Sequence, residues 1–64
     1  MYQDTDAQVQ TEMAALTLLI QRGDVTDIER REKTLRQTME DRNRTDVDIT
    51  LAIETCYQLA NGAN

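Results

Sequence analysis

Several residue types on which enzymes and metal sites depend are missing from this chain of 64 residues. It has no histidine, no serine and a single cysteine, Cys56. Without histidine the chain lacks the usual general base near neutral pH, and no neighbouring base is evident that would activate Cys56 as a thiolate nucleophile. One cysteine also excludes an internal disulfide and favours a reducing compartment. We therefore expect a cytoplasmic protein that is not an enzyme and uses no cofactor.

Proline, phenylalanine and tryptophan are absent as well, and glycine occurs only twice. A chain without proline, rich in Gln, Thr, Glu, Arg, Leu and Ala, favours helix throughout. The hydrophobic content of 39% beside 30% charged residues argues for a folded domain over a disordered one. No apolar run approaches the ~20 residues of a membrane span, and residues 1–10 are too polar and acidic for a signal peptide. We predict one soluble helical domain over residues 1–64.

The spacing of apolar residues predicts an all-α fold with three helices, over about 7–22, 27–42 and 46–60. In the first helix the apolar residues recur every three or four positions, which places them on one stripe. This stripe consists of Val9, Met13, Leu16 and Ile20. The second helix has a thinner stripe, made of Ile28, Leu35 and Met39. The third has a broad face, made of Ile49, Ala52, Ile53, Cys56, Leu59 and Ala60.

The helix boundaries follow from capping residues. Gly23 ends the first helix, because glycine readily adopts the left-handed conformation at that position. Thr26–Glu29 has the pattern of a capping box, and Thr45–Asp48 resembles one with aspartate in place of glutamate. The break near Asn43 is weak, so the second and third helices could also form one longer, bent helix. We expect residues 1–3 to be frayed.

The acidic pairs of the sequence do not indicate a metal site. Three of them stand at predicted helix starts, where capping explains them. They are Asp4 with Asp6, Asp24 with Asp27, and Asp46 with Asp48. The alternation Asp41, Asn43, Thr45 resembles the start of an EF-hand loop, but such a loop would need Gly at position 46 and Glu at position 52. The chain has Asp46 and Ala52 there, so we expect no bound metal.

Cys56 lies on the apolar face of the third predicted helix. Free cysteine in such a position usually behaves as a small buried hydrophobe. We expect Cys56 to be buried in this way, the alternative being a thiol at a dimer seam.

The basic residues are the best candidate for a nucleic-acid site. The net charge is −5, yet all seven bases lie between Arg22 and Arg44. The candidate basic patch consists of Arg30, Arg31, Lys33, Arg36, Arg42 and Arg44. Residues 30–44 hold six bases against three acids, a balance that would attract phosphates.

Other features of the basic stretch count against nucleic-acid binding. No aromatic residues are interleaved with the bases for stacking. Helical spacing also predicts ion pairs that would neutralise much of the charge. These are Asp27–Arg31, Glu29–Lys33 and Glu32–Arg36. A helix-turn-helix with Gly23 in its turn would direct several acids at phosphates. We therefore interpret the basic stretch as a solvated helix face. The net negative charge would also allow a protein that mimics DNA, but the sequence has no row of carboxylates at phosphate spacing.

Three apolar residues exceed what a single three-helix unit can cover. Leu18, Val47 and Leu51 point away from the main stripes of their helices. A chain of this size has a marginal core, so leaving all three in water would forgo stabilisation that it needs. We therefore predict a homodimeric helical bundle, with helices one and three of both copies set together. Leu18, Val47 and Leu51 are the candidate dimer interface.

The chain as a whole resembles the small accessory proteins of lambda-like temperate phages, encoded in the early region between the exonuclease and excisionase genes. The likeness lies in the apolar run 13–20, in the segment Gly23–Arg31, and in the last helix with Cys56 and Tyr57. The resemblance implies a helical, non-enzymatic bacteriophage protein that modulates the host or the choice between lysis and lysogeny. We thus expect a regulatory protein that binds a host or phage protein and no membrane. The alternative is a small nucleic-acid-binding protein that uses residues 30–44.

Overall fold

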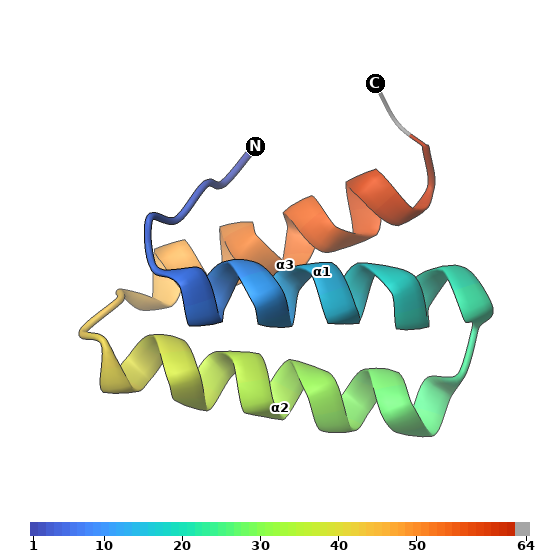
Figure 1. Cartoon of the computed structure of the whole chain (residues 1–64), viewed down its shortest axis with the longest axis horizontal. Coiled ribbons are helices and arrows are strands. Elements are labelled where there is room, and N and C mark those ends of the chain that lie inside the picture. The colour runs from blue at the N-terminus through green and yellow to red at the C-terminus, as the bar shows by residue number, and fades with distance from the viewer. Residues whose placement is uncertain (63–64) are drawn as a thin grey trace.

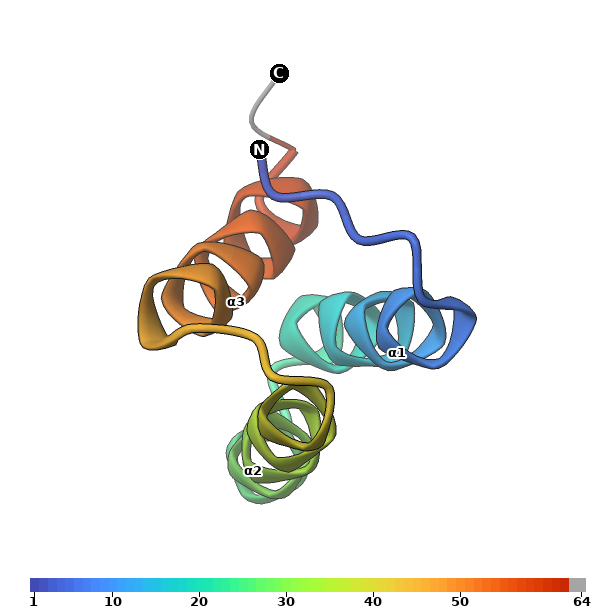
Figure 2. The ribbon, with the colours of Figure 1, turned by 90° about the vertical axis from the view of Figure 1, so that its left-hand side faces the viewer.

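The computed structural model describes residues 1–62 and has three α-helices, as Figure 1 shows. They are α1 (Ala7–Arg22), α2 (Val25–Asp41) and α3 (Asp46–Ala60). Helices α1 and α2 run antiparallel side by side, and viewed end-on the three helices form a triangle (Figure 2). The all-α prediction and the bounds of the first and third helices are confirmed. Residues 63 and 64 of the predicted domain lie outside the described part.

The two predicted helices with strong caps begin and end where the sequence indicates. The Asp6 carboxylate accepts hydrogen bonds from the backbone N–H groups of Gln8 and Val9, at 2.9 and 3.2 Å, and so caps α1. Gly23 closes α1 with a φ of 75°. At the start of α3, Thr45 and Asp48 form the expected capping box.

Helix α2 differs from its prediction at both ends. Asp24 is its N-cap, accepting from the backbone N–H of Asp27 at 3.2 Å, so the helix begins at Val25 and the capping box predicted at Thr26 is wrong. Its last residue is Asp41, and Asn43 follows with a φ of 61°. Asparagine tolerates this left-handed conformation, but an α-helix cannot continue through a residue that adopts it. The alternative of one long bent helix from α2 into α3 is therefore wrong.

The core lies between the three helices and uses the predicted stripes. Eight apolar residues are buried: Val9, Met13, Leu16, Leu35, Met39, Ile49, Ala52 and Cys56. Cys56 is thus a buried small hydrophobe, as expected. Leu59, which was expected on the core face of α3, is 46% exposed. The core is small, and α2 contributes only two residues to it.

The N-terminal segment, residues 1–5, packs against the helices. The prediction that residues 1–3 are frayed is wrong. In Figure 2 it passes over the space between α3 and α1, on the side away from α2. The backbone N–H of Tyr2 donates to the Thr55 hydroxyl oxygen at 2.8 Å, and the Tyr2 hydroxyl donates to the Asp4 carboxylate. These contacts hold the segment on α3 and help to bury Thr55, which is 3% exposed.

Candidate interaction surfaces

The three residues of the candidate dimer interface are all exposed in the single chain. Leu18 is 56%, Val47 67% and Leu51 44% exposed. Val47 and Leu51 lie one turn apart on α3 and line a shared hollow of about 250 Å³ with Asp46 and Thr50. Leu18 belongs to α1 and does not line this hollow. The structure therefore brings Val47 and Leu51 together and leaves Leu18 on another surface.

A second hollow continues along α3 from Leu51. It has a volume of about 330 Å³, and it lies between residues 1–3 and the exposed side of the helix. On the α3 side it is lined by Leu51, Glu54, Thr55 and Gln58. Leu51 thus lines both hollows. We call the exposed residues Asp46, Val47, Thr50, Leu51, Glu54 and Gln58 the α3 outer face. Sequence reasoning missed Met1 here, because residues 1–3 were expected to be frayed, and it missed Asp46, which was explained as a capping residue. It did not single out Glu54.

A third hollow, larger than the other two, is a groove between α1 and α3. It has a volume of about 620 Å³. Met13, Ala14 and Thr17 of α1 line one side, Leu59 of α3 lines the other, and residues 2–5 border it. Leu59 is half-exposed because, among the helices of residues 1–62, none covers this side of α1 and α3.

The side of α1 opposite the core is free of acidic residues. Ala7, Thr11, Ala14 and Leu18 are spaced four, three and four residues apart, so they share one stripe, and all four are exposed. We call this stripe the α1 outer face. The ionisable residues of α1 are Glu12, which is buried, and Arg22 in the last turn.

Two members of the candidate basic patch are used inside the fold. Arg44 binds the Asp4 carboxylate through two nitrogens, each at 2.8 Å, and Arg42 binds Asp6 at 2.7 Å. The hydrogen bonds from Arg44 hold the pKa of Asp4 far below its usual range. The hydrogen bond from Arg42 likewise lowers the pKa of Asp6. Asp4 therefore anchors the N-terminal segment. The prediction that it caps the first helix is wrong.

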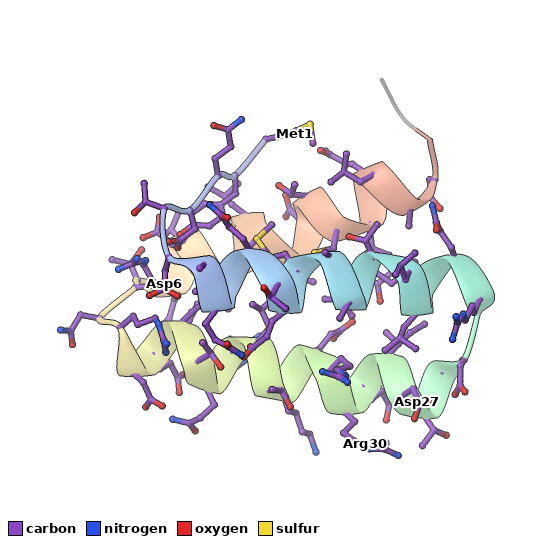
Figure 3. All side chains as sticks on the ribbon, in the orientation of Figure 1. Met1, Asp6, Asp27 and Arg30 are labelled. Atoms are coloured by element: carbon purple, nitrogen blue, oxygen red, sulfur yellow. The ribbon has the colours of Figure 1, made fainter. Side chains whose placement is uncertain are left out.

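The other four bases of the patch lie on α2. Arg30 pairs with Asp27 at 3.1 Å, and Figure 3 shows both near the start of the helix. Glu32 accepts a hydrogen bond from the Tyr57 hydroxyl at 2.8 Å, which links α2 to α3 and raises the pKa of Tyr57. Within residues 1–62 none of the three predicted ion pairs of α2 is formed. Arg31, Lys33 and Arg36 are exposed.

A carboxylate is buried between α1 and α2. Glu12 is 7% exposed. One of its oxygens accepts from the Gln8 side-chain amide at 2.7 Å and from the Thr38 hydroxyl at 2.9 Å. The other, Oε1, is buried without a hydrogen-bond partner. Such an orphaned oxygen is costly, whereas the hydrogen bond from Thr38 to the other oxygen links α2 to α1.

The Cys56 thiol is enclosed between α3 and α1. It donates to the backbone carbonyl oxygen of Met13 at 3.4 Å, and burial raises the pKa of the thiol. A buried thiol with a raised pKa is a poor nucleophile. In the part of the chain that the structure describes, no three residues among His, Cys, Asp and Glu are grouped to hold a metal ion. No helix there is long and apolar enough to cross a membrane.

Searches against protein-family models, curated proteins and solved structures found no match to this chain.

Proposed function

We propose that this chain is a non-enzymatic regulatory protein that acts through protein–protein interaction and associates as a homodimer. The observation that supports this most is the amount of apolar surface left outside a small core. Seven large apolar residues are at least 38% exposed: Met1, Leu18, Val25, Val47, Leu51, Tyr57 and Leu59. Scattered single residues of this kind are normal, but here several gather around hollows on α3 and beside the α1–α3 groove, as interaction sites do.

The α1 outer face is the part of the surface best suited to self-association. Each copy carries a net charge of −5, so two copies repel each other wherever acids meet. The α1 outer face has no acid, and its alanines allow the two helices to approach closely. Leu18 then supplies the apolar contact across a two-fold axis. We accordingly narrow the proposed dimer contact to α1, around Leu18.

Light scattering at micromolar concentration tests the dimer. We expect twice the 7.3 kDa mass of one chain. Leu18→Glu places a charge at the contact and should yield a monomer. Val25→Glu is the matched control, since Val25 is also exposed, at 65%, but lies on α2. A wild-type protein of single-chain mass, or loss of the dimer in both variants, would refute this part of the proposal.

Nucleic-acid binding remains the alternative proposal, with less support. With Arg42 and Arg44 paired to Asp6 and Asp4, residues 30–44 present four bases against three acids. Three of the four are exposed without an ion pair within residues 1–62, which is the observation in its favour. The measurement is a gel-shift titration with duplex DNA at physiological salt. Binding at sub-micromolar protein that weakens steeply as salt rises would favour the alternative.

The resemblance to accessory proteins of lambda-like phages suggests what such a regulator would act on. We propose a host or phage protein as the target, with an effect on host physiology or on the choice between lysis and lysogeny. Expression of the protein in a lysogen, compared with expression of Leu18→Glu, tests this extension. An equal lysis frequency with and without the protein would count against it.

A further inference from the structure

The α3 outer face combines two hollows, each with apolar residues in its lining, with unpaired acids. Its first hollow is lined by Val47 and Leu51 together with Asp46, and its second by Leu51 and Met1 together with Glu54. Each hollow therefore has one carboxylate beside its apolar lining. Neither Asp46 nor Glu54 forms an ion pair within residues 1–62.

No positive charge of α3 itself balances these acids. The helix carries Asp46, Asp48 and Glu54 and no lysine or arginine. The nearest base in the sequence, Arg44, is occupied by its two contacts with Asp4. Asp48 is engaged in the capping box, which leaves Asp46 and Glu54 facing solvent. A partner with positive charges at matching positions would complement the face.

A second copy of this chain does not provide such a partner. If two α3 outer faces packed together, the acids of both would meet with no base between them. Helix α2 of another copy offers exposed bases, but Val25, at its first position, is its only exposed apolar residue. Its other large apolar residues, Ile28, Leu35 and Met39, face the core of their own chain.

We propose that the α3 outer face binds a basic amphipathic helix of a partner protein, an inference that rests on the proposed function and names the partner's chemistry. The centres of the two hollows are about six residues apart along α3, or about 9 Å at 1.5 Å per residue. Two apolar side chains of the partner, seven residues apart on one helix face, span a similar distance and enter the two hollows. Lysine or arginine side chains next to them reach Asp46 and Glu54.

The test uses a synthetic peptide that has these features. It is a helix-forming, fluorescein-labelled peptide of alanine, leucine and lysine, with two leucines seven residues apart and lysines flanking them. A control peptide of the same composition has its two leucines on opposite sides of the helix, so that they cannot enter both hollows together. Fluorescence anisotropy measures binding to the full chain at physiological salt, and amide chemical shifts locate the contact.

Matched variants separate a specific site from general attraction of a basic peptide to an acidic protein. Asp46→Asn with Glu54→Gln removes two acids from the face. Glu29→Gln with Glu40→Gln removes two exposed acids from α2. Val47→Asn tests the apolar contribution to binding. Val47 is 67% exposed, so this substitution should leave the fold intact. Circular dichroism verifies that every variant is helical.

We expect the first double variant and Val47→Asn each to weaken binding about tenfold, which corresponds to about 1.4 kcal/mol. The α2 double variant should change it less than twofold, and the shifts should lie in residues 46–58. The inference is wrong if the control peptide binds equally well, if both double variants weaken binding alike, or if the shifts map to the α1–α3 groove. It is also wrong if no binding occurs up to about 1 mM peptide, the limit of a weak specific contact.

The dimer and the α3 site can fail independently. A dimeric wild type that does not bind the peptide would leave the proposed self-association intact and refute the α3 site. A monomer that binds the peptide through α3 would refute the dimer alone.

Discussion

Replacing the buried Glu12 by methionine should stabilise the protein. Glu12 lies between α1 and α2 at 7% exposure, and one of its oxygens has no hydrogen-bond partner. Methionine is unbranched, like glutamate, and its flexible thioether chain fits the same space with little repacking. The substitution removes a buried charge and its orphaned oxygen but takes away the acceptor for Gln8 and Thr38.

The magnitude follows from these opposing effects. Removing an unsatisfied buried oxygen returns about 1–3 kcal/mol, and the additional apolar burial adds about 1 kcal/mol. The two lost hydrogen bonds cost about 1–2 kcal/mol together, less than is usual for a charged acceptor, because Gln8 is exposed and Thr38 partly so and water can replace Glu12 as their partner. The net gain lies between zero and about 3 kcal/mol, with its centre at about 1–2 kcal/mol, and in a chain of this size each kcal/mol raises Tm by about 4–8 °C.

Urea denaturation followed by circular dichroism measures the change. Thr38→Val, made in the wild type and in Glu12→Met, completes a double-mutant cycle. The valine should be destabilising in the wild type, where it removes a donor to Glu12, and close to neutral in the Glu12→Met variant, where no acceptor remains. A loss of more than about 1 kcal/mol in Glu12→Met would refute the reasoning and show that the carboxylate stabilises the fold.

Three further predictions concern the anchor, the core and the thiol. Because its folded-state pKa is held below the ordinary value of 3.8, Asp4 contributes stability that is present above about pH 4 and lost as the pH falls further. Urea midpoints measured from pH 6 to pH 3 should therefore fall less steeply in Asp4→Asn than in the wild type, and equal slopes would show that Asp4 is no anchor. Leu16→Ala should cost about 2–5 kcal/mol and Leu18→Ala under about 1 kcal/mol in the same urea assay, because only Leu16 is fully buried; equal costs would contradict the observed core. A thiol reagent should label Cys56 only as fast as the protein unfolds, and rapid labelling of the native protein would show that the thiol is open to solvent.

The helices were predictable where local chemistry is decisive. The N-cap Asp6, the glycine at position 23 and the Thr45–Asp48 box each act within four residues, so the bounds of α1 and α3 follow from the sequence. At the start of α2 two capping residues compete. Asp24 and not Thr26 is the N-cap, because with Asp24 the helix begins two residues earlier and is two residues longer.

The candidate surfaces were less predictable because they depend on contacts between distant parts of the chain. Nothing near Tyr2 or Asp4 in the sequence indicates that their partners are Thr55 and Arg44. The same contacts take Arg44 out of the basic patch and build one wall of a hollow on α3. The exposure of Leu18 could be predicted, since a residue opposite the stripe of its helix faces outward whatever the neighbours do.

The separation of these contacts along the chain makes one surface of α3 depend on both ends of the fold. The N-terminal anchors join residues 36, 40 and 53 positions apart, at Asp6–Arg42, Asp4–Arg44 and Tyr2–Thr55. The α1–α3 contact between Cys56 and Met13 spans a similar distance, 43 positions. Residues 1–3 wall one hollow of α3, so that hollow exists only where the N-terminal segment is docked on the helix. A partner that recognises it therefore reads the two ends of the fold together.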